Sequence, residues 1–220
     1  MFAVLGLTTC LGACQGFVHA RAQIASVVVT LAGLGLWSGL ALAIGHTTIP
    51  IDAAHPAVAW LDGVSFGMPH SFAFAAAALF CVSVCLYGLP FGREVYAIGA
   101  NPRVAQLSGI FLGRVKTLVF ALSGLFSGLA GAAMVPRTAS GNPTIADSLL
   151  LPSIAAVLIG GTAMSGGSGG LGRTLIGVLT VTVLRVGIAA VGFDPAYEPI
   201  TYVVLVVVAA SLTSDRKSRD

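Results

Sequence analysis

Long runs of apolar residues, separated by short polar stretches, dominate the chain. A helix needs about 20 apolar residues to cross the roughly 30 Å of hydrocarbon in a bilayer. Seven runs approach this length, at about 2–19, 23–45, 70–91, 115–135, 148–164, 174–192 and 199–213. Because the fifth and seventh are short, the sequence predicts an all-α, polytopic transmembrane helical bundle of about six to seven spans. We assign residues 1–213 to this membrane domain and residues 214–220 to a tail.

The scarcity of charge points to the same fold class. Of the 220 residues, 56% are hydrophobic and only 9% are charged, whereas soluble domains are about 25% charged. The formal net charge of +3 is too small and too scattered for a phosphate-binding face. Composition therefore excludes a soluble enzyme, a disordered tail and a nucleic-acid-binding domain.

The few charges orient the runs. If the runs alternate in direction, one side holds Arg21, Arg93, Arg103, Arg114, Lys116, Arg173, Arg216, Lys217 and Arg219. The other holds Asp52, Asp62, Asp147, Asp194 and Glu198, with Arg137 as its only basic residue. Lys and Arg are retained on the cytoplasmic side, so we expect residues 92–114 and the C-terminus to be cytoplasmic. Seven spans would then place Met1 outside, which favours a chain that lacks upstream spans. An even number of true spans, with the first or fifth run re-entrant, is the alternative.

Residues 92–114 form an unusually long and only moderately polar cytoplasmic stretch. Asn101 before Pro102 resembles a helix cap followed by the first helical residue, and Gly109 ends the segment. The pattern predicts a two-turn amphipathic helix over 102–108. Such a helix suits docking into a groove on a partner protein, and an interfacial helix resting on lipid headgroups is the alternative.

A glycine-rich stretch between the fifth and sixth runs contains two nucleotide-binding patterns. Gly167-x-Gly169-x-x-Gly172 matches a dinucleotide fingerprint, and the same stretch resembles a P-loop with Arg173 in the place of lysine. Both motifs require a preceding β-strand, whereas an apolar helix is predicted here. The glycines therefore indicate a tight cytoplasmic turn over about 165–173 and close helix contacts.

Two further patterns lie within the predicted spans. Cys10/Cys14 and Cys81/Cys85 are each one helical turn apart, which favours small buried apolar side chains over disulfides, with a soft-metal site as the alternative. Gly124-x-x-x-Gly128, with Gly131, forms a small-residue face that predicts helix packing.

Several of these stretches together are similar to one transporter family. The matching segments are Thr30-Leu31, Ser38-Gly39-Leu40-Ala41-Leu42, Gly92-Arg93, Tyr96-Ala97-Ile98-Gly99-Ala100-Asn101, Ala105, Leu107-Ser108-Gly109-Ile110, Ser123-Gly124-Leu125, Leu129-Ala130-Gly131, residues 155–162, Gly166-Gly167-Ser168-Gly169 and Gly172-Arg173-Thr174-Leu175-Ile176-Gly177. They resemble the transmembrane permeases of ribose/xylose/arabinose-type, binding-protein-dependent ABC importers over nearly the whole chain. Residues 98–101 and 108–110 favour this sugar branch over the related branched-chain amino-acid permeases.

The resemblance has two departures. The resemblance implies about ten spans in a family member, against about six to seven predicted here, so this chain resembles only the C-terminal two-thirds and is expected to be shortened at its N-terminus. The penultimate span of the family commonly carries Asn-Gly, where this chain has Leu184-Arg185-Val186-Gly187.

The resemblance implies a function and its partners. It implies a non-enzymatic permease subunit of the bacterial plasma membrane that forms the path for a monosaccharide, while a separate ABC ATPase subunit binds and hydrolyses Mg-ATP. It further implies a second permease copy or paralogue, an extracytoplasmic sugar-binding protein, and no cofactor or metal in this chain. The stretch 92–114 becomes the coupling loop to the ATPase, with candidate residues Arg93, Gly99, Asn101, Arg103, Ala105, Ser108 and Gly109.

Arg185 is the other candidate, because an arginine within a span costs several kcal/mol unless it faces a partner or a water-filled path. We expect it to face the translocation path or the opposite protomer, and snorkelling to a water pocket is the alternative. Other functions remain open: a permease for branched-chain amino acids or other small polar solutes, a secondary transporter or metal exporter that uses the cysteines, or a non-functional truncated permease.

Overall fold

The computed structural model describes residues 2–45, 49–50, 63–65, 68–138, 140–144, 147–163, 166–192 and 199–204. The chain divides into two compact units. The first unit comprises Met1–Val95 and Arg103–Thr144, and the second comprises Tyr96–Pro102 and Ile145–Asp220.

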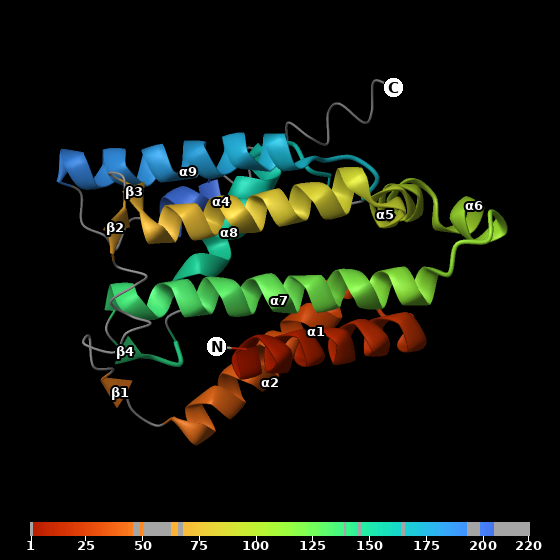
Figure 1. Cartoon of the computed structure of the whole chain (residues 1–220), viewed down its shortest axis with the longest axis horizontal. Helices are drawn as coiled ribbons and strands as arrows, with labels where there is room; N and C mark the ends of the chain where they lie inside the picture. Colours follow the sequence, from red (N-terminus) through yellow and green to blue (C-terminus); the bar gives the residue numbers. More distant parts are fainter. Residues whose placement is uncertain are drawn as a thin grey trace. The chain divides into compact units, whose positions relative to one another are not determined.

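Helices make up nearly all of the described secondary structure (Figure 1). They are α1 (Phe2–Ala22), α2 (Ser26–Ile44), α4 (His70–Ser83), the π-helical turn η1 (Val84–Gly88), α5 (Pro90–Ala100), α6 (Pro102–Leu107), α7 (Leu112–Thr138), α8 (Asp147–Ile159) and α9 (Leu171–Val191). The described strands have two residues each: β1 (Ile49–Pro50) pairs with β4 (Ser140–Gly141), and β2 (Val64–Ser65) pairs with β3 (Met68–Pro69), both antiparallel. The predicted all-α helical class is confirmed.

Five described helices are long and apolar enough to cross a membrane: Ala3–Ala22, Ser26–Ile44, His70–Gly88, Leu112–Val135 and Leu171–Val191. They correspond to the first four predicted runs and the sixth. The fifth run forms the shorter apolar helix α8, which contains Pro152. The seventh run is helical over 199–204, and the rest of it, with the predicted tail 214–220, lies outside the described residues. The division into a membrane domain and a tail stays a prediction.

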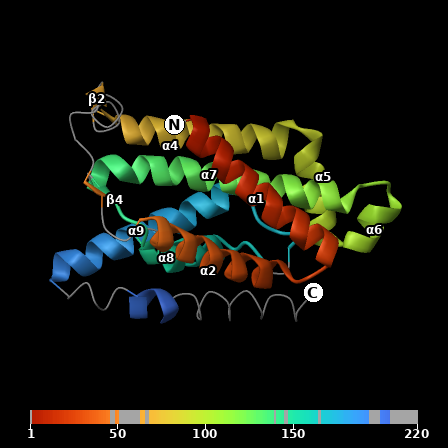
Figure 2. The same ribbon diagram turned by 90° about the horizontal axis from the view of Figure 1, so that it is seen from below.

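In the first unit, α1 and α7 lie side by side (Figures 1 and 2), and glycines lie at their contact. A Cβ atom at Gly124 would lie 3.2 Å from Gly12 Cα and would also strike the Thr8 carbonyl oxygen. A Cβ at Gly16 would lie 2.8 Å from Thr117 Cα. Small residues let two helix backbones approach this closely and so maximise van der Waals contact in lipid. The predicted packing role of Gly124-x-x-x-Gly128 is confirmed, whereas Gly131 has open space beside it.

A buried histidine fixes the turn from α1 to α2. His19 is 9% exposed, and its Nδ1 lies 2.7 Å from the carbonyl oxygen of Ile24. Its ring also lies on the α7 residue Phe120, with 5.5 Å between ring centroids. The side chain therefore links the turn to the α1–α7 contact, because it bonds to one and packs on the other.

In the second unit, α8 and α9 form a similar close pair. A Cβ at Gly177 of α9 would meet the backbone of Ala156, and one at Gly160 would lie 3.0 Å from Thr174 Cα. The buried core of the pair consists of Ala155, Ala156, Val181 and Tyr202, with Leu151 and Ile159 packed against it. Small residues thus allow α8 and α9 to pack closely, as they do for α1 and α7 in the first unit.

Candidate functional site

The first part of the predicted loop 92–114 is a helix, α5, which the sequence analysis missed. Leu89 has extended backbone angles (φ −104, ψ 151), and Pro90 starts the helix after it. A residue before proline disfavours the helical region, and proline at the first helical position loses no hydrogen bond. The pair Leu89-Pro90 was the available signal, and Gly92 and Gly99 obscured it because glycine is a poor helix former.

The predicted short helix over 102–108 is confirmed as α6, Pro102–Leu107. Its C-terminus is a Schellman motif, in which the Gly109 N–H donates to the Gln106 carbonyl and the Ile110 N–H donates to the Ala105 carbonyl, each at 3.1 Å. Gly109 has φ +84, a conformation that glycine adopts without steric cost. Gly109 therefore ends the helix for the reason that the sequence suggested.

Most side chains of α6 are exposed, and one is buried. Ala105 is only 3% exposed, whereas Val104 is 57% exposed and Leu107 is 85% exposed. Phe111, just past the helix, is also exposed, with the Arg114 guanidinium 4.9 Å from its ring centroid. In Figure 1, α6 lies beyond the N-terminal end of α7. The helix thus buries Ala105 and leaves three apolar side chains in and just after it exposed, Val104, Leu107 and Phe111, which we call the apolar ridge.

The other predicted coupling residues have varied surroundings. Arg93, Asn101, Arg103 and Ser108 are exposed, and Ser108 Oγ donates to the Val104 carbonyl at 3.0 Å. Gly99 is half-buried at the C-terminal end of α5. The role of these residues in a partner contact stays a prediction.

The glycine-rich turn contacts the end of α5 within the second unit. Tyr96 Oη donates to the Gly169 carbonyl at 3.3 Å. A Cβ at Gly99 would lie 3.1 Å from Gly167 Cα, and a Cβ at Gly167 would lie 2.9 Å from Ala100 Cα. The two unusual stretches of the sequence are therefore in direct contact. Because they lie some 70 residues apart in the chain, the sequence pattern did not predict this contact.

The turn itself is shorter than predicted, because α9 already begins at Leu171. Its backbone closes on itself, since the Ala163 N–H donates to the Ser168 carbonyl at 3.1 Å and the Gly166 N–H donates to the Ala163 carbonyl at 3.0 Å. The helix α8, not a strand, precedes the glycines. A nucleotide-binding loop requires a strand before its glycines. Because a helix precedes Gly167, Gly169 and Gly172, neither nucleotide-binding pattern has the structural context that it requires.

Arg185 belongs to neither of these stretches. It is exposed on α9, about 21 Å along the helix from Leu171. The helix runs from 171 to 191, so Arg185 lies about 6 Å from its middle, toward the C-terminal end. The prediction of a mid-span arginine is thus refined, because a long side chain that far off centre reaches a membrane interface more readily.

The cysteine pairs lie on helix surfaces. Cys10, Cys14 and Cys81 are exposed, Cys85 is intermediate, and all four are free thiols. The expectation of buried cysteines is wrong for the first three, since an apolar thiol on a membrane-spanning helix can face lipid as well as a core. Among the residues that the structure describes, no group of three or more His, Cys, Asp or Glu side chains gathers.

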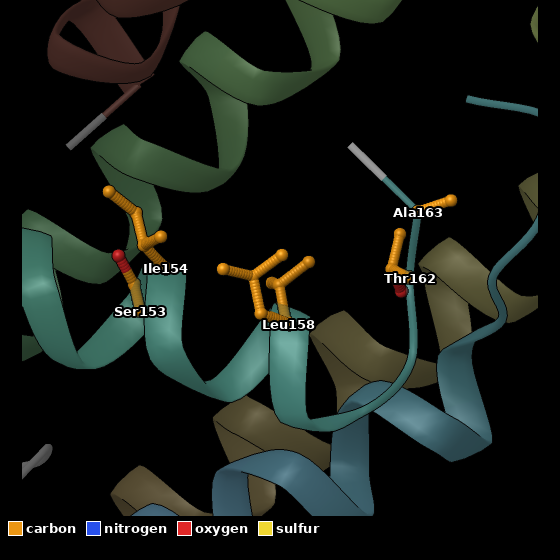
Figure 3. A pocket seen from close by; sticks show the side chains of 6 residues that line it. Ser153, Ile154, Leu158, Thr162 and Ala163 are labelled. Carbon is orange, nitrogen blue, oxygen red and sulfur yellow. The ribbon is translucent and has the colours of Figure 1, made fainter. Parts of the chain in front are cut away.

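A hollow of about 310 Å³ lies along α8 in the second unit (Figure 3). It is lined by Ser153, Ile154, Val157, Leu158, Thr162 and Ala163. Ser153 Oγ already donates to the Leu150 carbonyl at 2.8 Å, so few polar groups converge on the hollow. A site that recognised a polyhydroxylated or zwitterionic solute would need several such groups, and this hollow does not provide them.

The chain is similar to known membrane permeases. The sequence model of the family described as "Branched-chain amino acid transport system / permease component" matches residues 1–210. A ribose import permease protein of Bacillus subtilis is 35% identical over 92% of this chain and 63% of its own length. A probable ABC transporter permease protein of Escherichia coli is 40% identical, over 81% of this chain and 55% of its own length. An L-arabinose transport system permease protein of Escherichia coli is 30% identical, over 93% of this chain and 62% of its own length.

The chain thus spans about 55% to 63% of the length of the first two of these relatives. No solved structure matches the chain.

Proposed function

The chain belongs to the family of branched-chain amino acid transport system permease components, and from this premise we propose that it is the membrane-spanning permease subunit of an ATP-driven monosaccharide importer. The observation that supports this most is the similarity to permeases named for ribose and arabinose, which extends over more than nine-tenths of the chain. Five long apolar helices suit a multi-pass protein of the inner membrane.

The proposed division of labour leaves ATP hydrolysis to a partner. A separate ABC ATPase subunit would bind Mg-ATP, an extracytoplasmic binding protein would deliver the sugar, and a second permease copy or paralogue would complete the path. This chain would act without a cofactor or metal of its own and would convert closure of the ATPase into alternating access. Such a role needs a docked element that transmits a rigid-body motion.

We assign that role to α6 and its flanks, with a cytoplasmic C-terminus as the orientation. The apolar ridge of Val104, Leu107 and Phe111 supports this assignment, because an exposed ridge on a short helix suits a groove on a partner. Arg93 and Arg103 lie near it in sequence and are exposed, which suits contact with an acidic rim of the ATPase.

One observation favours a second candidate function. The description of the matching family refers to branched-chain amino acids, whereas the relatives named above carry sugar names. A permease for branched-chain amino acids would share the fold and the ATPase partner and differ only in its solute.

Deletion of the gene in the source bacterium separates the two candidates. Uptake of radiolabelled ribose, xylose, arabinose and leucine is measured in the parent, the deletion strain and a complemented strain. We expect uptake of at least one monosaccharide to fall about tenfold or more, because the path itself is lost, while leucine uptake stays unchanged. Loss of leucine uptake alone would favour the amino-acid permease, and unchanged uptake of every solute would contradict both.

Arg185→Met tests the path hypothesis for that arginine. If Arg185 donates hydrogen bonds to a passing sugar, loss of a charged donor should reduce the uptake rate by about tenfold, equivalent to roughly 1.4 kcal/mol. Membrane levels of the protein, followed by immunoblot, should not fall, because the side chain is exposed on α9. Arg185→Lys is the matched control and should retain part of the activity. Uptake at the parental rate in Arg185→Met would assign the side chain to snorkelling instead.

A further inference from the structure

The contact between the end of α5 and the glycine-rich turn is suited to transmit motion from one element to the other. We propose that this contact, which we call the glycine clasp (Tyr96, Gly99, Ala100, Gly166, Gly167 and Gly169), is the relay that carries a displacement of the C-terminal end of α5 to the α8–α9 pair. The inference rests on the proposed function of α6 as the element docked on an ATPase. It adds the route by which the motion enters the membrane helices.

The clasp is stiff because main chain meets main chain. A Cβ at Gly166 would lie 3.1 Å from the Gly99 carbonyl oxygen, and a Cβ at Gly167 would lie 3.0 Å from the Ala100 nitrogen. Because the contact is made by backbone atoms, it has no side-chain rotamer that could change to absorb a small shift. The bond from Tyr96 Oη to the Gly169 carbonyl, 3.3 Å long, adds a second point of attachment. A push on α5 is therefore passed directly to the turn.

The input side of the clasp is short. Only Asn101 separates the end of α5 at Ala100 from the start of α6 at Pro102, and the Asn101 N–H donates to the Ala97 carbonyl at 3.1 Å. Proline fixes its own φ and restricts the residue before it. Asn101 and Pro102 thus form a short, conformationally restricted junction directly after the end of α5.

The output side is tied to both helices of the α8–α9 pair. The turn closes through the bond from the Ala163 N–H to the Ser168 carbonyl. Beside it, a Cβ at Gly160 would lie 2.6 Å from the Arg173 carbonyl oxygen, which shows how tightly α8 and α9 meet there. Rigid elements that share such packing move together. A displacement of the turn should therefore reach α8 and α9 as one body.

Gly167→Ala is the main test, with Gly161→Ala as its matched control. Both glycines have nearly equal positive φ, +78 and +74, so the backbone strain of the new Cβ is the same. At Gly167 that Cβ would strike Ala100, whereas at Gly161 it would meet nothing within 4 Å. Any difference between the two variants therefore reports the clasp rather than the cost of alanine at positive φ.

The readout is the number of sugar molecules imported per ATP hydrolysed. It is measured in proteoliposomes that contain the complete transporter purified from native membranes. This ratio does not change when a variant merely lowers the amount of folded protein, because both rates fall together. We expect the ratio to fall about tenfold in Gly167→Ala, a coupling loss of the usual size for one contact, and less than about twofold in Gly161→Ala.

Tyr96→Phe is a second variant that tests the same contact if the transporter with Gly167→Ala does not assemble. It removes only the hydroxyl that donates to Gly169, and we expect the ratio to fall about threefold, with assembly intact. Equal ratios in Gly167→Ala and Gly161→Ala, or an unchanged ratio in Tyr96→Phe, would overturn the relay while leaving the proposed function in place. No ATP-driven uptake by the wild-type complex would overturn the proposed function, and the relay with it.

Discussion

Gly124→Leu is expected to separate α1 from α7 and to lower the free energy of unfolding by about 3 kcal/mol, at the upper end of the usual cost of overpacking. The reason is that the new side chain would meet main chain at Thr8 and Gly12, which cannot change rotamer to make room. In lipid, the two helices gain their association from close van der Waals contact, so added distance removes most of it. Unfolding in a titration with denaturing detergent, followed by circular dichroism, measures the change.

Gly131→Leu is the matched control for this prediction. Gly131 lies on the same helix, and a Cβ there would meet nothing within 4 Å. The substitution should change the free energy of unfolding by less than about 0.5 kcal/mol, as is usual away from packed sites. Equal effects of the two substitutions would show that leucine on α7, rather than the contact with α1, causes the loss.

Ala105→Phe is expected to lower the rate of ATP-driven uptake about tenfold or more. Ala105 is the buried residue of α6, and an aromatic ring has no space there. On the proposed docking of α6 to an ATPase, the ring would displace the apolar ridge of Val104, Leu107 and Phe111 from the position that the contact requires. A misplacement of about 1 Å can cost a hundredfold when function depends on orientation. Uptake and ATP hydrolysis are measured together on the purified transporter, and hydrolysis should lose its response to sugar.

Ala105→Gly controls for helix stability at the same position. It removes volume and costs about 1 kcal/mol of helix propensity, but it leaves the fit of α6 intact. Uptake should stay within about twofold of the wild type. If Ala105→Phe also transports normally, α6 does not couple the two subunits, and the docking assignment fails.

The sequence predicted those features that depend on local rules. The spans followed from runs of about 20 apolar residues, and α6 followed from Pro102 at its start and Gly109 at its end. The packing role of Gly124 followed from its spacing to Gly128. Each of these signals is complete within a few turns of one helix.

Other features depended on information outside any one segment. Helix α5 was missed because Gly92 and Gly99 lower its intrinsic helix propensity, yet both glycines meet backbone of other residues at close range, Gly92 at Leu86 and Gly99 at Gly167. Tertiary contact thus outweighs propensity there. The clasp itself joins residues far apart in the chain, and a single sequence does not carry that pairing. The role of Arg185 likewise depends on what α9 faces.

The apolar ridge on α6 has a consequence for the life of the protein in a cell. Leu107 is 85% exposed and Phe111 is 68% exposed, and such side chains attract chaperones and proteases until another protein covers them. A molecule of this protein that finds no binding partner would therefore be degraded quickly. If α6 docks on an ATPase as proposed, the abundance of this chain should therefore follow the supply of that ATPase.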